Sequence, residues 1–169
     1  MSSLIDTSTL STQQAILLST DGTVTDLIRH FTGEHIHVTK LSQSIIVDNQ
    51  PVALQLNSPT QLLHRRILLT GSRHYLYAES FFVIERMSEY LRKELLESDI
   101  PIGLLWQREK LETFREIISS QCEDNRELIE YFSEAESNDA KFMSRSYLIY
   151  HGGVPLGLIT EKFPASYFK

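Results

Sequence analysis

Two charged side chains lie among apolar neighbours in segments that alternate like β-strands. Arg65 lies two positions after Leu63, and Glu161 lies two positions before Phe163. Because successive residues of a strand point to opposite faces of a sheet, each charge is expected on an apolar face. A guanidinium can receive a carboxylate through two parallel hydrogen bonds, and a carboxyl group can hold a hydroxyl or a proton. Arg65 and Glu161 are therefore the first candidates for binding or catalysis.

A buried charge is costly unless it is paired or bound to another charged group. In one interpretation, Arg65 and Glu161 form a structural ion pair. In the other, they line a pocket in which Arg65 binds a carboxylate and Glu161 holds a hydroxyl or a proton. The alternation of the strands supports both interpretations equally.

Other residues with metal-binding or nucleophilic chemistry give weaker signals. His35 and His37 share a strand face, but two histidines without a third ligand make a poor metal site, so both are expected to face solvent. Cys122 is the only cysteine and cannot form an intrachain disulfide. Gly152-Gly153 lacks the lysine and the strand–loop–helix context of a phosphate-binding loop. The sequence thus predicts no metal site.

The composition narrows the class of protein. The chain has 169 residues, which is typical of a single domain, 1–169, with enough apolar material for one core. It carries 22 acidic and 16 basic residues, a balance that argues against a nucleic-acid partner, since phosphate-backbone binding needs a basic surface. No apolar run approaches the about 20 residues of a membrane span, and no secretory signal is visible. A cytoplasmic protein that does not enter membranes is expected.

Hydrophobic spacing and turn residues predict strands joined by hairpins, with helices gathered separately. Apolar residues recur at helical spacing after Thr23 until Gly33, a residue that commonly ends helices. Gly152-Gly153 lies between two alternating runs and predicts a hairpin. This pattern favours an α+β fold with an antiparallel sheet. Helices are expected at 12–19, 24–31 and 85–96 with a short turn at 104–106, strands at 35–39, 44–47, 62–70, 75–84, 111–119, 146–150 and 156–160, little order at 2–11, and an exposed acidic helix or long loop at 123–136.

Four segments, in order along the chain, resemble motifs of the chorismate pyruvate-lyases. Residues 155–166 are similar to the family's C-terminal motif, in which a Thr-Glu pair precedes a Phe/Leu-Pro-Ala-Ser turn. Residues 65–69 resemble its Arg-x-Ile-Leu-Leu strand. Residues 100–103 resemble its Pro-Leu-Gly or Pro-Ile-Gly segment, and Arg115-Glu116 matches an Arg-acid pair shortly after it. The resemblance extends from about Leu17 to the end of the chain.

The resemblance implies a six-stranded antiparallel sheet with helices packed on one side and a ligand enclosed between them. It implies an enzyme that splits chorismate into 4-hydroxybenzoate and pyruvate without a metal or an organic cofactor. The family's carboxylate-binding arginine corresponds to Arg65, and the glutamate that contacts the ring hydroxyl corresponds to Glu161. Its apolar residue in the Pro-Leu-Gly segment corresponds to Ile102. A methionine near the first helix of the family corresponds to Val24, with Thr23 as an equal match.

The chain departs from the family pattern at two places. Some relatives carry a Gly-Arg pair on the strand after the hairpin, where this chain has Ala78-Glu79. If that arginine helps to bind substrate, another cation must replace it. The candidates are Arg73, Arg86 and Arg115. The acidic segment 123–139 resembles an insertion relative to shorter members, with a surface, dimer-contact or pocket-covering role.

Three functions therefore compete. The first is a chorismate lyase with chorismate as its small-molecule substrate. The second is a non-catalytic module of the same architecture, like the effector domains of some transcription regulators, which would hold its ligand unchanged. Those modules normally follow a DNA-binding helix-turn-helix, for which the short Ser/Thr-rich start of this chain is too little. The third is a structural or interaction protein, in which the buried charges pair internally. The oligomeric state is open.

Overall fold

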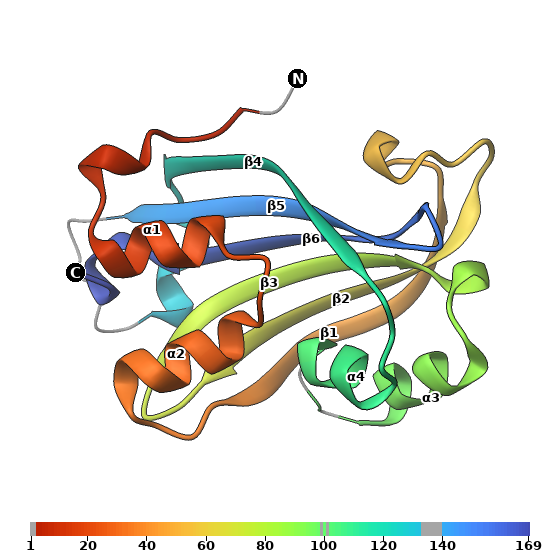
Figure 1. The fold of residues 1–169 in the computed structure, drawn as a ribbon, viewed down its shortest axis with the longest axis horizontal. Helices are drawn as coiled ribbons and strands as arrows, with labels where there is room; N and C mark the ends of the chain where they lie inside the picture. Colours follow the sequence, from red (N-terminus) through yellow and green to blue (C-terminus); the bar gives the residue numbers. More distant parts are fainter. Residues whose placement is uncertain (1–2, 99, 101, 133–139) are drawn as a thin grey trace.

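Six antiparallel strands form a single sheet in the order β1-β2-β3-β6-β5-β4 (Figure 1). The computed structural model describes residues 3–98, 100, 102–132 and 140–169. Every pair of neighbouring strands is antiparallel. The strands are β1 (His37–Asp48), β2 (Thr60–Thr70), β3 (His74–Val83), β4 (Phe114–Asp124), β5 (Lys141–His151) and β6 (Val154–Pro164).

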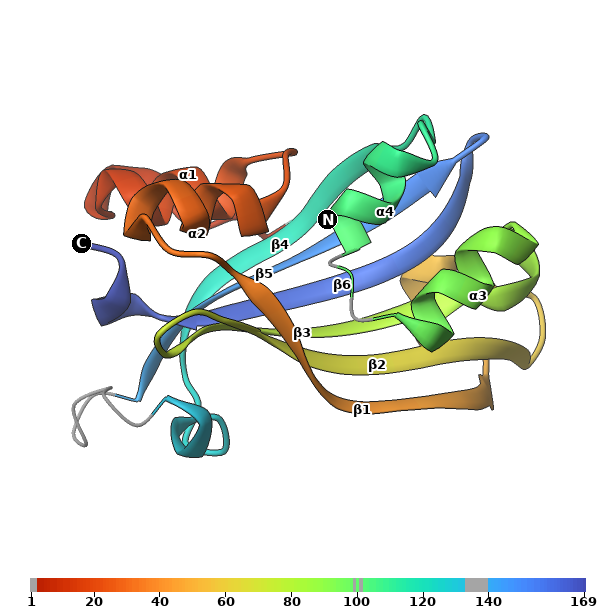
Figure 2. The ribbon, with the colours of Figure 1, turned by 90° about the horizontal axis from the view of Figure 1, so that it is seen from below.

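Within the described residues, four α-helices lie on one face of this sheet (Figure 2). They are α1 (Thr12–Ser19), α2 (Val24–Thr32), α3 (Glu89–Glu97) and α4 (Ile102–Arg108). α1 and α2 lie over one end of the sheet, and α3 and α4 over the other (Figures 1 and 2). The predicted α+β architecture with helices on one side is confirmed. None of the helices in the described part of the chain is both long and apolar enough to cross a lipid bilayer.

The first two helices begin and end where their sequence predicts. Ser11 caps α1 through a capping box, because its hydroxyl accepts from the Gln14 amide while the Gln14 side chain accepts from the Ser11 amide. α2 ends at Gly33, whose φ of 72° is left-handed and favours a residue without Cβ. These two helices fix the position of the short connection between them, which forms one wall of the site described below.

Apolar side chains fill the space between the helices and the sheet in two clusters. One lies under α1 and α2 and includes Leu17, Ile28 and Phe163. The other lies under α3 and α4 and includes Phe82 and Trp106. On the opposite face of the sheet, residues 125–132, with the 3-10 helix η4 (Ile129–Tyr131), cover a third cluster (Figure 2).

Several predicted elements differ in extent from the structure. The strands expected at 35–39 and 44–47 form one strand, β1, with a bulge between Lys40 and Ser42. The helix expected at 85–96 begins only at Glu89, because a 3-10 helix (η3, Ile84–Arg86) comes first. In residues 123–132, the described part of the segment expected at 123–136, β4 continues to Asp124 and η4 follows, so that this part is neither a long helix nor a plain loop. Residues 133–139 lie outside the described part.

Residues 3–11, where little order is expected, have defined backbone partners. Ser3 forms an isolated parallel bridge with Ser119, and its carbonyl accepts from the Ser120 amide at 2.8 Å. The Ile5 amide donates to the Ser120 hydroxyl at 3.0 Å, and Thr7–Thr9 forms the 3-10 helix η1. The edge strand β4 offers unpaired backbone groups, which explains why this segment pairs with it.

Candidate active site

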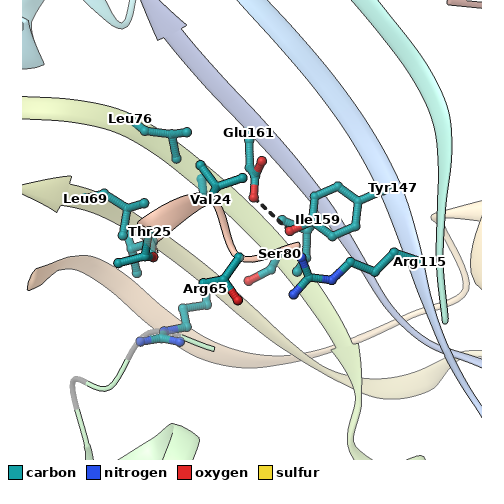
Figure 3. Close-up of a pocket in the computed structure, with 13 residues that line it drawn as sticks. Val24, Thr25, Arg65, Leu69, Leu76, Ser80, Arg115, Tyr147, Ile159 and Glu161 are labelled. Atoms are coloured by element: carbon teal, nitrogen blue, oxygen red, sulfur yellow. Dashed lines mark hydrogen bonds between the residues drawn. The ribbon is translucent and has the colours of Figure 1, made fainter. Parts of the chain in front are cut away.

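Arg65 and Glu161 line one cavity between the sheet and the beginning of α2 (Figure 3). The helix side of the cavity is formed by Thr23, Val24 and Thr25, and the sheet side by residues from β2, β3, β4, β5 and β6. The lining is mostly apolar, with a few polar groups converging on it, as in many small-molecule sites. The alternation of β2 and β6 thus predicts correctly that both charges turn to the helix-covered face.

Arg65 lies in the middle of β2, opposite Ser80 of β3, and only 2% of its surface is exposed. The neighbouring residue Arg66 points to the other face of the sheet, where its Nε donates to the Tyr77 hydroxyl at 2.8 Å. A single strand therefore places one arginine on the cavity side of the sheet and the next one on the other side. This pair offers a matched comparison for experiments on the cavity.

Glu161 accepts hydrogen bonds on both of its carboxylate oxygens. Arg145 Nε donates to Oε2 at 2.8 Å. The Tyr147 hydroxyl donates to Oε1 at 2.8 Å (Figure 3). The ion-pair partner of Glu161 is thus Arg145 and not Arg65, which corrects the interpretation of Arg65 and Glu161 as an internal pair. With a donor at each oxygen, Glu161 is arranged as an acceptor, and a carboxylate retains lone pairs for a further donor.

The pKa values of Arg145 and Tyr147 are shifted by their burial and by the neighbouring Glu161. Arg145 is 1% exposed, and burial is the strongest influence and acts to lower its pKa, but the charge and hydrogen-bond interactions with Glu161 and Tyr147 together outweigh it and raise the pKa of Arg145. Burial, and after it the negative charge of Glu161, raises the pKa of Tyr147. Tyr147 therefore remains a neutral donor. The guanidinium of Arg145 also lies over the Tyr147 ring, at 4.8 Å from the ring centre.

Of the three arginines considered as a replacement cation, Arg115 is the one that lines the cavity. Its Nη1 donates to the Gly22 carbonyl at 2.5 Å. Arg86 instead donates to backbone carbonyls around Leu54, and Arg73 lies over the Tyr167 ring. Glu79, at the departure noted from the family pattern, faces the opposite side of the sheet.

The Glu79 carboxylate there lies 2.9 Å from His64 Nε2. The acid at position 79 therefore adds no negative charge to the cavity wall. His35 and His37, on the edge of the molecule, are exposed as predicted.

The remaining predicted site residues, Val24 and Ile102, belong to α2 and α4. Val24 lines the cavity, as does its alternative Thr23. Ile102 is the first residue of α4, and its side chain lies outside the part of the chain that the structure describes.

Sequence reasoning missed Arg145 and Tyr147. The signal was present, because Arg145 alternates with Tyr147 and Ile149 on β5 as Arg65 alternates with apolar residues on β2.

The cavity is small in this conformation, with an open volume of about 50 Å³. Beside it lies a more open pocket of about 350 Å³, lined among others by Asp21, Trp106 and Lys110. Thr23 and Arg115 line both spaces. These two residues therefore form the partition between the inner cavity and the outer pocket.

Comparison with known proteins identifies a matching family and relatives similar in sequence. A family model described as "Chorismate pyruvate-lyase Rv2949c-like" matches residues 18–169. The chorismate pyruvate-lyase of Mycobacterium leprae is 28% identical over 161 residues, which cover 91% of this chain and 75% of that protein. The chorismate pyruvate-lyase of Mycobacterium tuberculosis (strain H37Rv) is 26% identical over 162 residues, which cover 91% of this chain and 80% of that protein.

Among solved structures, PhnF from Mycobacterium smegmatis has a TM-score of 0.66 at 13% identity, covering 89% of this chain and 67% of that chain. The C-terminal domain of the histidine utilization repressor from Pseudomonas syringae pv. tomato has a TM-score of 0.60 at 12% identity, covering 79% of this chain and 94% of that chain. At these identities, the likeness shows a shared fold.

Proposed function

The chain belongs to the Rv2949c-like chorismate pyruvate-lyase family, and from this premise we propose that it eliminates pyruvate from chorismate to give 4-hydroxybenzoate. The observation that carries the proposal is that Arg65 and Glu161, from strands separated in sequence, line the same apolar cavity. One group suits a carboxylate and the other a hydroxyl, which are the substituents at opposite ends of the product ring.

In the proposed complex, the Arg65 guanidinium binds the ring carboxylate through charge-assisted hydrogen bonds. The ring lies against apolar side chains of the sheet such as Ile67 and Ile159, and Val24 covers it from the helix side. At the far end, a lone pair of the Glu161 carboxylate accepts the hydrogen bond of the ring hydroxyl. Arg145 and Tyr147 hold that carboxylate in place.

The elimination breaks the ether bond between the ring and the enolpyruvyl group. The ring carbon that bears the hydroxyl loses its hydrogen, whose bonding pair completes the aromatic ring. The ether electrons leave with the enol oxygen, and pyruvate forms when a proton adds to the methylene carbon. Because aromatisation already favours the products, the protein has mainly to hold one conformer and exclude alternatives. The donors on both oxygens of Glu161 favour a role as acceptor towards the hydroxyl, rather than as a proton donor.

Incubation of the purified protein with chorismate tests the proposal. We expect 4-hydroxybenzoate and pyruvate in equal amounts, and loss of measurable pyruvate release in Arg65→Ala with an unchanged circular dichroism spectrum. Arg66→Ala is the matched control, because the Arg66 side chain points to the other face of the sheet. Undiminished pyruvate release by Arg65→Ala would contradict the assignment.

A second candidate function is a non-catalytic small-molecule-binding module. The shared fold with PhnF and with the C-terminal domain of a repressor supports it. The same cavity would then hold its ligand unchanged. Binding of chorismate without release of pyruvate would favour this function over the lyase.

A further inference from the structure

Arg115 brings a positive charge to the cavity wall, and none of the acidic residues that the structure describes forms an ion pair with it. Its Nη1 donates to the Gly22 carbonyl, and its guanidinium lies 5.5 Å from the centre of the Tyr147 ring. Both partners are uncharged. A guanidinium in a partly dry site binds an anion more strongly than it binds a carbonyl group.

Arg145 shows the contrasting arrangement on the neighbouring strand. Its charge is matched by Glu161 in an ion pair of which both side chains are almost fully buried. Arg145 and Glu161 therefore add no net charge to the site. The charge of Arg115 remains available for a ligand, and Figure 3 shows Arg115 and Arg65 on opposite sides of the group of cavity residues.

We propose that Arg115 is a specificity-determining residue that binds the second carboxylate of a dianionic ligand, exchanging the Gly22 carbonyl for it. The inference rests on the proposed function, in which Arg65 takes the ring carboxylate and a dicarboxylate is the substrate. A ligand with a single carboxylate leaves Arg115 on Gly22. The site thereby distinguishes ligands by charge, in addition to the ring hydroxyl that Glu161 accepts.

The position of Arg115 suits this exchange. It stands with Thr23 between the inner cavity and the outer pocket. A substituent that projects from a ring in the inner cavity towards the outer pocket must therefore pass Arg115. The Tyr147 ring lies beside the guanidinium and provides a cation–π contact on the cavity side.

This arrangement also gives the substrate and the ring product different affinities for the site. The lyase reaction converts one dianion into two monoanions, so the link between the two carboxylates is lost when the ether bond breaks. The ring product then keeps the contact with Arg65 and loses the contact with Arg115. Arg115 accordingly strengthens binding of the substrate without strengthening binding of the ring product.

Calorimetric binding of two unreactive ligands tests the inference. 4-Hydroxybenzoate carries one carboxylate, and 3-(carboxymethoxy)-4-hydroxybenzoate adds a second one through an ether link to the same ring. For Arg115→Gln we expect affinity for the dicarboxylate to fall by about tenfold to a hundredfold, the range of a lost charge-assisted contact. Affinity for 4-hydroxybenzoate should stay within about twofold, since that ligand does not engage Arg115. The affinity of Arg115→Lys for the dicarboxylate should lie between those of the wild-type protein and Arg115→Gln, because lysine keeps the charge and lacks the planar guanidinium.

Arg108→Gln, which removes the same charge from an exposed position of α4, is the control and should leave both affinities unchanged. Equal losses for both ligands in Arg115→Gln would mean that Arg115 only supports the cavity wall, and would overturn the inference. A wild-type protein that does not prefer the dicarboxylate would overturn it too. Neither ligand reacts, so this result is independent of pyruvate release. A protein that discriminates through Arg115 but releases no pyruvate would refute the lyase and keep the inference.

Discussion

Replacement of Arg145 by methionine should be among the most destabilising single changes in this protein. The variant keeps a side chain of similar length but leaves Glu161 in the interior without its cation. The pair is joined at 2.8 Å, and its side chains are 1% and 9% exposed. Removing one partner of such a buried pair costs about 3–5 kcal/mol of the free energy of unfolding. The lost hydrogen bond to the Thr20 carbonyl acts in the same direction.

Urea denaturation followed by circular dichroism measures the effect. With a dependence on urea of about 2 kcal/mol per molar, the midpoint should fall by about 1.5–2.5 M. Arg29→Met is the matched control, since Arg29 pairs with Asp26 at the surface and such pairs contribute at most about 1 kcal/mol. In the double variant Arg145→Met with Glu161→Gln, the cost should be smaller than the sum of the single costs. Strict additivity, or an Arg145→Met effect no larger than that of Arg29→Met, would refute the reasoning.

Three further changes have defined outcomes. Gly157→Ala would place a Cβ 2.6 Å from Cε1 of the fully buried Phe82 ring, so thermal melting should show a loss of about 1–3 kcal/mol, and an unchanged melt would speak against this close contact. Burial raises the pKa of Tyr147 above its ordinary value of 10.0, so the unfolded chain loses this proton first and stability should fall as the pH rises above 10.0. Urea titrations at rising pH should show a shallower decline for Tyr147→Phe. Ser11→Ala removes one half of the capping box and the hydrogen bond that the Ser11 hydroxyl donates to the Phe168 carbonyl, and should cost about 1–2 kcal/mol in the same assay, whereas Ser11→Thr keeps the hydroxyl and should retain most of the stability.

The fold could be predicted from the sequence because its signals are local. Gly33 ends α2, and Gly152-Gly153 turns the last hairpin, in each case with positive φ that favours glycine. The alternation of apolar residues in β2 and β6 then decides which side chains face the helices. Less could be predicted where two local tendencies compete, as at residues 84–88, where a 3-10 helix precedes the cap of α3 at Ser88.

The partner of Glu161 could not be predicted, because strand register depends on a bulge. A regular hairpin around the turn 152–153 would place Arg145 opposite Thr160. The structure has a bulge after Ile149, which shifts the register by one residue and places Arg145 opposite Glu161. A shift of one residue moves every side chain to the other face relative to its partner strand. The alternation therefore identified a buried acid but not the cation that satisfies it.

The sequence also could not show which of Arg73, Arg86 and Arg115 lines the cavity. Arg115 contacts Gly22, from which it is separated by 93 residues, and this contact exists only once β4 passes beside the α1–α2 connection. Composition and periodicity carry no information on such a contact. The structure shows this contact, and it places at the cavity the charge that, in our proposal, distinguishes a dicarboxylate from a monocarboxylate.

The size of the cavity predicts that ligand binding moves the α1–α2 connection. A cavity of about 150 Å³ accommodates a benzene ring, whereas the inner cavity has about 50 Å³. Most of its wall belongs to the sheet, whose strands are held by their neighbours. The remaining wall, residues 23–25, directly follows residues 20–22, which are held to the sheet through hydrogen bonds that Arg145 donates to the Thr20 carbonyl and Arg115 donates to the Gly22 carbonyl. We therefore expect residues 20–25 to move when a ligand enters the cavity.

Hydrogen exchange with mass spectrometry should therefore show 4-hydroxybenzoate slowing exchange in a peptide covering residues 18–26. Exchange in the free protein requires the same opening that admits the ligand, and a bound ligand lowers the population of the open form. A peptide covering α3 (Glu89–Glu97), which contributes nothing to the cavity lining, serves as the internal control. Arg145→Met should accelerate exchange in 18–26 without ligand, because it removes one of the two hydrogen bonds that hold the connection. Ligand binding that leaves 18–26 unchanged would show that another part of the wall yields, and that the two arginines do not hold the entrance closed.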